Sequence, residues 1–275
     1  AQQRLQRAYP AVKVLGIACD VTKPEELAAA LSAIEAFFPN SEIGAVFANA
    51  GTLFNKTILK SSIDEWATTL NVNVLGVVNT IQAFLPKMQL SETGSIFCTT
   101  ASVGGLVRGD GGTASYQASK HAVVSLTESL SFEIARRSPQ IRVHVLCPCI
   151  VESALPTNSK TNAQEESGEI NANDIQPSST PTIDFAMTTE NHAQQVFDLI
   201  AANKFYLLTD NVRPYVNHDY PFEALKIVRE RMENMSDLTL DNAGAFPTEP
   251  GDTKTSTLTG AMFREARKRK TPAAK

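Results

Sequence analysis

Ser95-Ile-Phe-Cys-Thr-Thr100, followed at once by Ala101-Ser102, is the stretch that decides the fold. It is short and has no polar alternation, which is typical of a parallel strand covered on both faces. Four similar runs lie at residues 12–19, 43–48, 141–147 and 205–209. Helical patterns alternate with them, at residues 26–38, 62–88, 115–137, 189–202 and 221–235. This alternation predicts an α/β fold with a doubly wound parallel sheet built from βαβ units.

One of the predicted helices begins with a capping box, in which a hydroxyl side chain and an acidic side chain three residues later bond to each other's backbone. Thr22-Lys-Pro-Glu25 opens the helix of residues 26–38 and has proline in the first turn. Ser62-Ile-Asp-Glu65 opens the helix that runs towards Met88. We therefore place both helix starts at these motifs.

Composition limits the classes of function that remain. The 275 residues are 43% hydrophobic and 20% charged, which is ordinary for a globular protein with a buried core. A formal net charge of −4 disfavours partners such as nucleic acid or an anionic membrane, and no apolar run approaches the ~20 residues of a membrane span. The four cysteines and four histidines show no metal-ligand spacing, so no metal site is expected. These features favour a reducing, cytoplasmic setting.

The predicted elements form a single domain over residues 1–242. Residues 153–187 are polar and show little periodicity, which is typical of a mobile substrate loop. From residue 243 to residue 275 the composition is that of a disordered tail, ending in the basic run Arg267-Lys-Arg-Lys270. A basic patch for nucleic acid or membrane is the alternative interpretation of residues 264–270, and a solvated tail is the commoner one.

The sharpest chemical signal is Tyr116-Gln-Ala-Ser-Lys120. Residues i and i+4 share one face of a helix, so the phenol and the ammonium can converge on one site. A nearby ammonium favours the phenolate, which brings a tyrosine into a useful range for acid–base catalysis. Tyr9 and Lys13 have the same spacing, but Pro10 and a strand-like run follow Tyr9, so we interpret Tyr9 as a packing residue.

Three further polar residues follow or join these elements. Asn49 comes directly after the run 43–48, and Ser102 comes two residues after the end of Ser95–Thr100. The carboxyl ends of parallel strands line one crevice, so both side chains are expected in the same cleft as Tyr116. Asn73 lies within the helix predicted over residues 62–88.

At this point the chain resembles the short-chain dehydrogenase/reductase family over roughly residues 3–220. The resemblance is carried by ordered motifs: Cys19-Asp-Val-Thr22, Ala48-Asn-Ala-Gly51, Leu70-Asn-Val-Asn-Val74, Thr100-Ala-Ser-Val-Gly104, Tyr116-Gln-Ala-Ser-Lys120 and Pro148-Cys-Ile-Val-Glu-Ser153. Two positions depart from the family pattern, because Ala48 replaces an asparagine and Cys149 replaces a glycine. The fold that the resemblance implies is of the Rossmann type.

The resemblance implies an NAD(P)-dependent oxidoreductase of the alcohol dehydrogenase or carbonyl reductase type, with a catalytic tetrad of Asn73, Ser102, Tyr116 and Lys120. Hydride would pass between nicotinamide and a small alcohol or carbonyl substrate. Tyr116 would transfer the proton, Lys120 would shift the phenol pKa and hold the nicotinamide ribose, and Ser102 would bond the substrate oxygen. Asn73 would support a water-linked proton path by bending its helix.

The cofactor implied in the same way is NAD or NADP. Its expected contacts are Asp20, Val21, Asn49, Ala50, Gly51, Tyr116, Lys120, Pro148, Val151 and Ser153. Asn49 can equally be a structural link between strand and helix, and Ser153 can be merely the start of the loop. An apolar substrate pocket is expected beside Phe54, Val103, Val107, Leu155 and the loop 153–187.

The glycine-rich turn that cradles the cofactor pyrophosphate in the family has no counterpart in the chain. Gly105-Leu-Val-Arg-Gly-Asp-Gly111 fits its spacing but falls between Ser102 and Tyr116, so we interpret it as a loop beside the substrate pocket. Residues 2–9 resemble the end of the family's second helix. The expectation is an incomplete sequence that lacks the first βαβ segment: first strand, glycine turn, first helix and second strand. The choice between NAD and NADP is then unreadable.

One other function stays open at this stage: a non-catalytic scaffold or binding protein that has lost the cofactor site. The complete tetrad argues against it, whereas the absent glycine turn and Cys149 argue for it. In either case the family implies a homodimer or homotetramer assembled through the helices 62–88 and 115–137.

Overall fold

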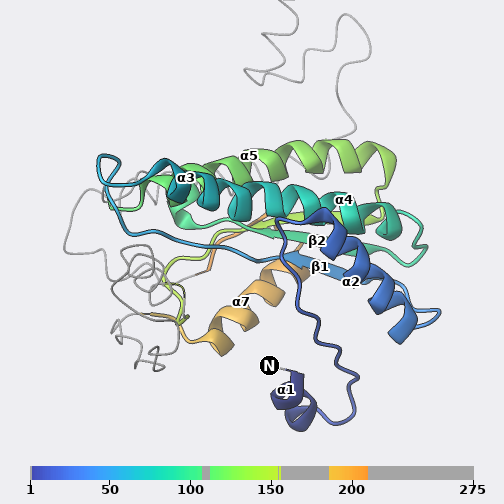
Figure 1. Cartoon of the computed structure of the whole chain (residues 1–275). Coiled ribbons are helices and arrows are strands. Elements are labelled where there is room, and N and C mark those ends of the chain that lie inside the picture. Colours follow the sequence, from blue (N-terminus) through green and yellow to red (C-terminus); the bar gives the residue numbers. More distant parts are fainter. Residues whose placement is uncertain (1, 107–111, 154, 156–185, 210–275) are drawn as a thin grey trace, which may run out of the picture.

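A computed structural model describes residues 2–106, 112–153, 155 and 186–209. In this part of the chain, strands β1 (Ala45–Ala48), β2 (Ser95–Thr100), β3 (Ile141–Leu146) and β4 (Tyr206–Leu207) form one sheet in the order β1-β2-β3-β4. All neighbouring pairs are parallel. Figure 1 shows the layers on either side of this sheet. The predicted α/β fold with a doubly wound parallel sheet is confirmed.

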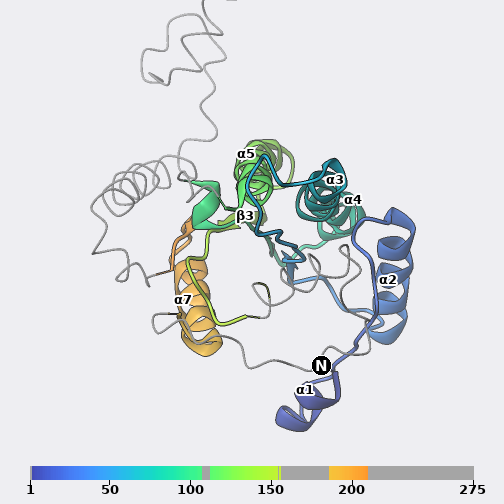
Figure 2. The same cartoon turned by 60° about the vertical axis from the view of Figure 1, so that its left-hand side comes forward.

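Helices cover both faces of the sheet, which explains why its strands are unbroken apolar runs. Helices α4 (Gly76–Met88) and α5 (Ala114–Arg137) lie on one face, and α7 (Thr189–Ala201) lies on the other (Figures 1 and 2). Phe97, Met88 and Val123 are fully buried between the sheet and the first pair of helices. Cys98 and Leu207 are buried with Ile200 on the α7 side. The core is therefore two layers, one on each side of β2 and β3.

The helix predicted over residues 62–88 is divided into three pieces. Helix α3 (Ile63–Leu70) begins where predicted, with a capping box that the structure adds: Ser62 accepts a hydrogen bond from the Glu65 backbone, and the Glu65 carboxylate accepts one from the Ser62 backbone. A π-helical turn, Asn71–Leu75, follows before α4 begins. A π turn widens the helix by one residue and is frequent at functional sites. This turn carries Asn73.

The capping box predicted at Thr22-Lys-Pro-Glu25 is wrong. Helix α2 (Pro24–Phe37) begins with Pro24 in its first turn, but its N-cap, Lys23, makes no capping hydrogen bond. The Thr22 hydroxyl donates instead to the Asp20 carboxylate at 2.7 Å, and the Asp20 backbone donates to Glu26 at 2.7 Å. The local carboxylate competes for the threonine hydroxyl, as short polar side chains commonly allow.

The strand predicted over residues 12–19 is also wrong. These residues are extended, yet within the described part of the chain they pair with no strand. Helix α1 (Gln2–Ala8) provides their hydrogen bonds instead. Gln2 bonds the carbonyl of Val14 and the amide of Gly16, and Gln6 bonds the carbonyl of Val12 and the amide of Val14. Gln2 and Gln6, one helical turn apart, thus make hydrogen bonds that a neighbouring strand would otherwise make with this segment.

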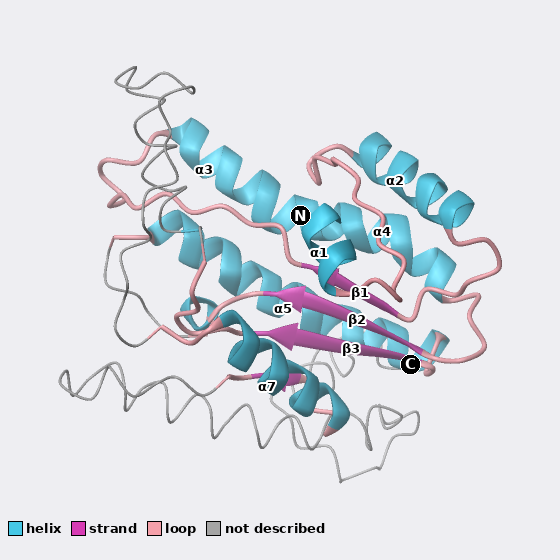
Figure 3. Cartoon of the chain, turned by 90° about the horizontal axis from the view of Figure 1, so that it is seen from below, coloured by secondary structure: helices cyan, strands magenta, loops and turns pink. Residues whose placement is uncertain are grey.

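Some predicted segments lie outside the described residues. They are the helix at 221–235, the tail at 243–275, most of the loop 153–187, and Val107. Figure 3 shows β1, β2 and β3 side by side from the α7 side. Their carboxyl ends lie together, and this arrangement positions the site described next.

Candidate active site

The side chains predicted to act together converge where β2 ends and α5 begins. Ser102 follows β2 and caps a short 3₁₀ turn, Val103–Gly105, by accepting a hydrogen bond from the Gly104 amide at 3.1 Å. Gly105 lies against α5 so closely that a Cβ there would be 2.6 Å from the Lys120 carbonyl oxygen. The turn after the strand is therefore seated on the helix, and only glycine fits at the point of contact.

Ser102 and Tyr116 meet in this corner. The Ser102 hydroxyl is near enough to the Tyr116 phenol that hydrogen bonding with it lowers the phenol pKa. The Ser102 hydroxyl is also 3.5 Å from the carbonyl of Pro148, which follows β3. The Val103 amide donates to that same carbonyl at 2.9 Å. Segments that follow two different strands thus fix the serine beside the tyrosine.

Lys120 approaches Tyr116 from one turn further along α5, as the i, i+4 spacing predicts. Its ammonium lies 5.6 Å from the centroid of the tyrosine ring and donates to the Thr100 carbonyl at 2.8 Å. The side chain is buried, and burial lowers the pKa of Lys120 to about 8, an effect that Cys147 partly opposes. A large fraction of these ammonium groups is still charged near neutral pH.

The phenol pKa differs in direction from the sequence expectation. Burial raises the pKa of Tyr116 above its ordinary value, the hydrogen bond with Ser102 lowers it in part, and Cys147 adds to the rise. Desolvation disfavours the phenolate more than the pattern of residues alone suggested. In this structure Tyr116 is therefore a protonated phenol at neutral pH.

Asn73 is completely buried in the π-helical turn and is held by three hydrogen bonds. Its carbonyl oxygen accepts from the Thr52 amide at 2.8 Å, and its NH₂ group donates to the Thr52 carbonyl at 3.0 Å and to the Ser119 hydroxyl at 2.9 Å. The Ser119 hydroxyl donates in turn to the Tyr116 carbonyl at 2.6 Å. Asn73 is thus tied through Ser119 to helix α5, which carries Tyr116 and Lys120.

Sequence reasoning missed Ser119 and Thr52. Ser119 lies inside the quoted Tyr116–Lys120 motif, so its hydroxyl was visible, but no local pattern indicated a partner 46 residues away. Thr52 takes part through its backbone, which carries no residue-specific signal. Both depend on how the elements pack.

The residues predicted to bind the cofactor fall into three places. Asn49 and Ala50 are exposed just after β1, where the Asn49 side chain accepts from the Thr100 hydroxyl at 3.0 Å. A Cβ on Gly51 would be 3.4 Å from the Asn73 carbonyl oxygen and 3.5 Å from the Lys120 nitrogen. The end of β1 therefore reaches Lys120.

Asp20 and Val21 lie further along the same side of the molecule. The Asp20 carboxylate is exposed, and hydrogen bonds from Thr22 lower its pKa. Val21 packs on the π turn and α4, where a Cβ on Gly76 would come within 2.7 Å of its side chain. Asn79 donates to the Val21 carbonyl at 2.9 Å. The segment is held by α4.

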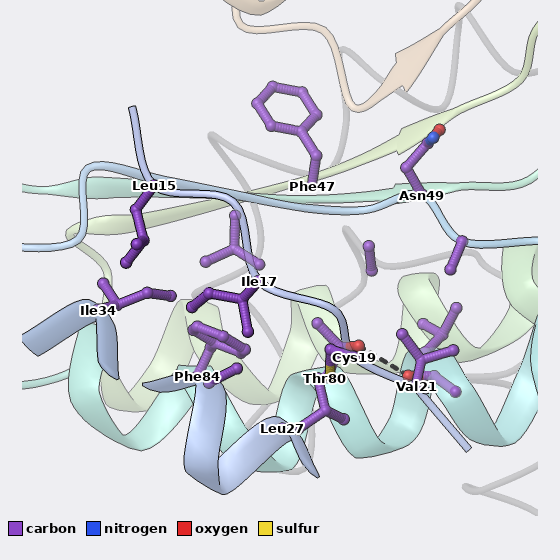
Figure 4. Close-up of a pocket in the computed structure, with 16 residues that line it drawn as sticks. Leu15, Ile17, Cys19, Val21, Leu27, Ile34, Phe47, Asn49, Thr80 and Phe84 are labelled. Carbon is purple, nitrogen blue, oxygen red and sulfur yellow. Dashed lines mark hydrogen bonds between the residues drawn. The ribbon is translucent and has the colours of Figure 1, made fainter. Parts of the chain in front are cut away.

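A cavity of about 370 Å³ connects the segment that contains Val21 with Asn49 and Ala50 at the end of β1. It is lined by Val21, Asn49 and Ala50 together with apolar side chains of the segment 15–21, α2, β1 and α4 (Figure 4). None of Ser102, Tyr116, Asn73 and Lys120 lines it. The cavity therefore lies beside β1, apart from the cluster that carries the acid–base groups.

Pro148, Val151 and Ser153 form the third place, after β3. Val151 forms an isolated parallel bridge with Met187, whereas Ser153 is exposed. Cys149, which departs from the family's glycine, is half-buried, and burial raises the pKa of its thiol. Of the residues predicted to border the substrate pocket, Phe54 is buried, and Val103 and Leu155 are half-buried.

Two negative observations concern the described residues alone. Among them, no group of three or more His, Cys, Asp or Glu side chains is placed to hold a metal ion. No helix within these ranges has both the length and the apolar character needed to cross a membrane.

Comparison with known proteins agrees with this geometry. A family model described as short chain dehydrogenase matches residues 1–166. An uncharacterized oxidoreductase of Listeria innocua is 35% identical over 153 residues, which are 55% of this chain and 59% of that protein. Carbonyl reductase family member 4 of Danio rerio is 31% identical over 153 residues, which are 56% of this chain and 62% of that protein. The chain thus spans about three fifths of the length of these relatives.

Comparison with solved structures also finds short chain dehydrogenases. A short chain dehydrogenase/reductase from Burkholderia phymatum, solved in complex with NAD, superposes with a TM-score of 0.64. The two chains are 28% identical, and the alignment covers 90% of this chain and 84% of that one. The ordered motifs, the parallel sheet and the matched residues 1–166 lead to one conclusion: the chain belongs to the short-chain dehydrogenase/reductase family.

Proposed function

We propose that this chain carries the acid–base site of an NAD- or NADP-dependent oxidoreductase that interconverts an alcohol and a carbonyl compound. The proposal rests on the cluster of Ser102, Tyr116 and Lys120. Hydrogen bonding with Ser102 lowers the pKa of the Tyr116 phenol, and the centroid of the Tyr116 ring lies 5.6 Å from the Lys120 nitrogen. The NAD complex of the Burkholderia phymatum relative and the carbonyl reductase name of the Danio rerio relative support the cofactor and the substrate class.

The division of labour follows from the environments of the three groups. The nicotinamide cofactor, when bound, supplies or accepts the hydride. Tyr116, whose pKa is raised by burial, donates the proton to the carbonyl oxygen of the substrate. Ser102 bonds the same oxygen and keeps it within reach of the phenol. The Lys120 ammonium stabilises the phenolate that remains after proton transfer.

The residues present fit the nicotinamide ribose end of such a cofactor. Lys120 presents an ammonium beside Tyr116, and Gly51 has no side chain that would fill the space next to that ammonium. Asn49 and Ala50 are exposed at the end of β1, on the path from Lys120 towards Val21. We therefore assign Lys120, Tyr116 and the backbone of residues 49–51 to the ribose end, and Asp20 and Val21 to the adenine end.

The experiment that tests this function is a fluorescence titration of the 275-residue chain with NADH and NADPH in parallel, followed by an assay of carbonyl reduction. Saturable binding of either nucleotide with turnover is the expected result, and the tighter one identifies the cofactor. A chain that is folded by circular dichroism but binds neither nucleotide would contradict the proposal. That result would favour the second candidate, a scaffold protein.

The assembly and setting that we propose are a homodimer or homotetramer in the cytoplasm. Large apolar side chains are exposed on α3, the π turn and α5, among them Leu70 at 38%, Leu75 at 51% and Phe132 at 44%. Helices of this kind can bury such side chains against a second copy. The four cysteines are all free, which is typical of a reducing compartment. Sedimentation velocity measures the oligomeric state directly.

A further inference from the structure

The Ser119 hydroxyl lies in the middle of a series of hydrogen bonds beside the cluster of Ser102, Tyr116 and Lys120. It is completely buried, and its single proton goes to the Tyr116 carbonyl at 2.6 Å. Its oxygen accepts from the Asn73 NH₂ group at 2.9 Å. One hydroxyl therefore joins helix α5 to the π-helical turn.

The orientation of the Asn73 amide is determined by its partners. The carbonyl oxygen must face the Thr52 amide, which can only donate, and the NH₂ group must face the Thr52 carbonyl, which can only accept. The remaining N–H then points to Ser119. Without that hydroxyl, a buried N–H would lose its acceptor, and buried donors without an acceptor are strongly disfavoured.

This chain of bonds ends at the Thr52 backbone, one residue from Gly51, which lies beside Lys120. Asn73 holds both polar groups of the Thr52 backbone, and the preceding residue, Gly51, lies next to the Lys120 ammonium. We propose that Ser119 is a positioning residue that holds the Asn73 amide and, through it, the backbone of residues 51–52 against Lys120. The assignment rests on the proposed function, in which Lys120 serves Tyr116.

The position of that backbone decides how much water reaches the ammonium. The pKa of Lys120 is lowered to about 8 by burial, and the titratable groups that face it are Tyr116 on the same helix and Cys147 after β3. If the backbone of residues 51–52 moves away, water enters and the desolvation is relieved. The pKa of Lys120 then rises towards its ordinary value.

The experiment is an NMR titration of lysine side chains labelled with ¹³C at the ε position, in the full chain without cofactor or substrate. The Lys120 signal is identified by its loss in Lys120→Met. Ser119→Ala is expected to raise the Lys120 midpoint by about one pH unit. It is also expected to accelerate hydrogen exchange of the Thr52 amide. Neither readout needs turnover, so a failed activity assay does not affect this test.

Thr127→Val is the matched control. Thr127 lies on the same helix, is completely buried, and likewise bonds a carbonyl of its own helix, Val123 at 2.6 Å, and a second side chain, Thr99 at 2.7 Å. Its loss removes a comparable hydroxyl without touching Asn73. The Lys120 midpoint of this variant is expected to match that of the unmodified chain.

Two outcomes would overturn the proposal: an unchanged Lys120 midpoint in Ser119→Ala, or equal shifts in Ser119→Ala and Thr127→Val, which would indicate general loosening of α5. If Ser119→Ala does not fold, Ser119→Cys keeps a similar volume with a weaker hydrogen-bonding group. The same titration then decides the matter, with a smaller rise supporting the proposal and an unchanged midpoint rejecting it.

Discussion

Polar groups find their hydrogen-bond partners in different ways in two regions: at the carboxyl end of β1 and along the outer side of β1. At its carboxyl end, the site cluster is closed by buried hydrogen bonds that join residues far apart in sequence, such as Asn73 with Ser119 and Lys120 with Thr100. Along its outer side, the extended residues 12–19 bond exposed glutamine side chains of α1, and a cavity of about 370 Å³ separates them from the strand. The comparison teaches that an apolar run becomes a strand only where a neighbouring strand accepts its hydrogen bonds.

The largest expected effect is on turnover, through a residue of the candidate site at the carboxyl end of β1. Tyr116→Phe removes the only group that we assign to proton transfer, so turnover is expected to fall by about 10²–10⁴-fold. Cofactor affinity should change little, because Lys120 remains. The measurement is steady-state kinetics with nucleotide binding on the same sample.

Tyr9→Phe is the control for that prediction, because Tyr9 and Lys13 repeat the same spacing on the other side of the molecule. Tyr9 is 61% exposed, so its interpretation as a packing residue is wrong, and it belongs to no site that we describe. Its variant should retain full turnover. Equal activity of Tyr116→Phe and Tyr9→Phe would refute the acid–base assignment.

The second prediction compares packing on the two sides by stability. Phe97 in β2 is completely buried, whereas Phe47 in β1 is 39% exposed and contacts Phe197 edge to face at 6.3 Å between ring centroids. Phe97→Ala is expected to lower the free energy of unfolding by about 3–5 kcal/mol, because it leaves a large cavity. Phe47→Ala should cost about 1 kcal/mol or less. Urea denaturation of both variants measures the difference, and equal losses would show that β1 is packed as tightly as β2.

The third prediction concerns the contact between the turn after β2 and α5. Gly105→Ala places a methyl group 2.6 Å from the Lys120 carbonyl oxygen, so backbone must move, at an expected cost of about 1–3 kcal/mol. Gly44→Ala is the matched control, since a Cβ at Gly44 meets nothing within 4 Å. Urea midpoints that coincide for the two variants would mean that the turn is not seated on α5.

The smallest effect is expected at the outer side. Gln2→Ala combined with Gln6→Ala removes the hydrogen bonds to residues 12–16, all of which are exposed or half-buried, so the free energy of unfolding should change by less than about 1 kcal/mol. Hydrogen exchange at the Val14 and Gly16 amides should nevertheless become faster. Gln3→Ala removes a glutamine of the same helix outside this set and should leave that exchange unchanged, and a failure to accelerate in the double variant would contradict the bonding described.

Much of the fold followed from local patterns. The strands at Ser95–Thr100 and 141–146 and the helix Ala114–Arg137 were readable because each hydrophobic run and each helical repeat is continuous in sequence. The run at 12–19 has the same apolar composition but forms no hydrogen bonds with a neighbouring strand in the described part of the chain. Composition alone does not indicate which backbone segment will lie beside a given run. Helix capping shows the same limit: the capping box predicted at Thr22 does not form, because Thr22 bonds Asp20, whereas a capping box that was not predicted forms at Ser62.

The candidate site divides in the same way. Tyr116 and Lys120 are one helical turn apart, so helix geometry alone was enough to predict that they share a face. Their proton affinities depended on burial, which raises the pKa of Tyr116 and lowers that of Lys120 to about 8. The sequence could therefore indicate which groups we propose for acid–base chemistry but could not determine the direction of the shift in the phenol pKa.

What the sequence by itself determined is the family, the alternation of strands and helices, and the identity of the residues that meet at the carboxyl ends of β1 and β2. The alternation of strands and helices follows from periodicity and spacing, which are properties of neighbouring residues. The family and the site residues follow from the resemblance of the ordered motifs. What only the tertiary structure decided is the π turn at Asn73, the link from Ser119 to Thr52, the use of glutamines beside residues 12–19, and the pKa directions. Each of these depends on which distant groups exclude water or accept a hydrogen bond, and such partners are chosen by packing.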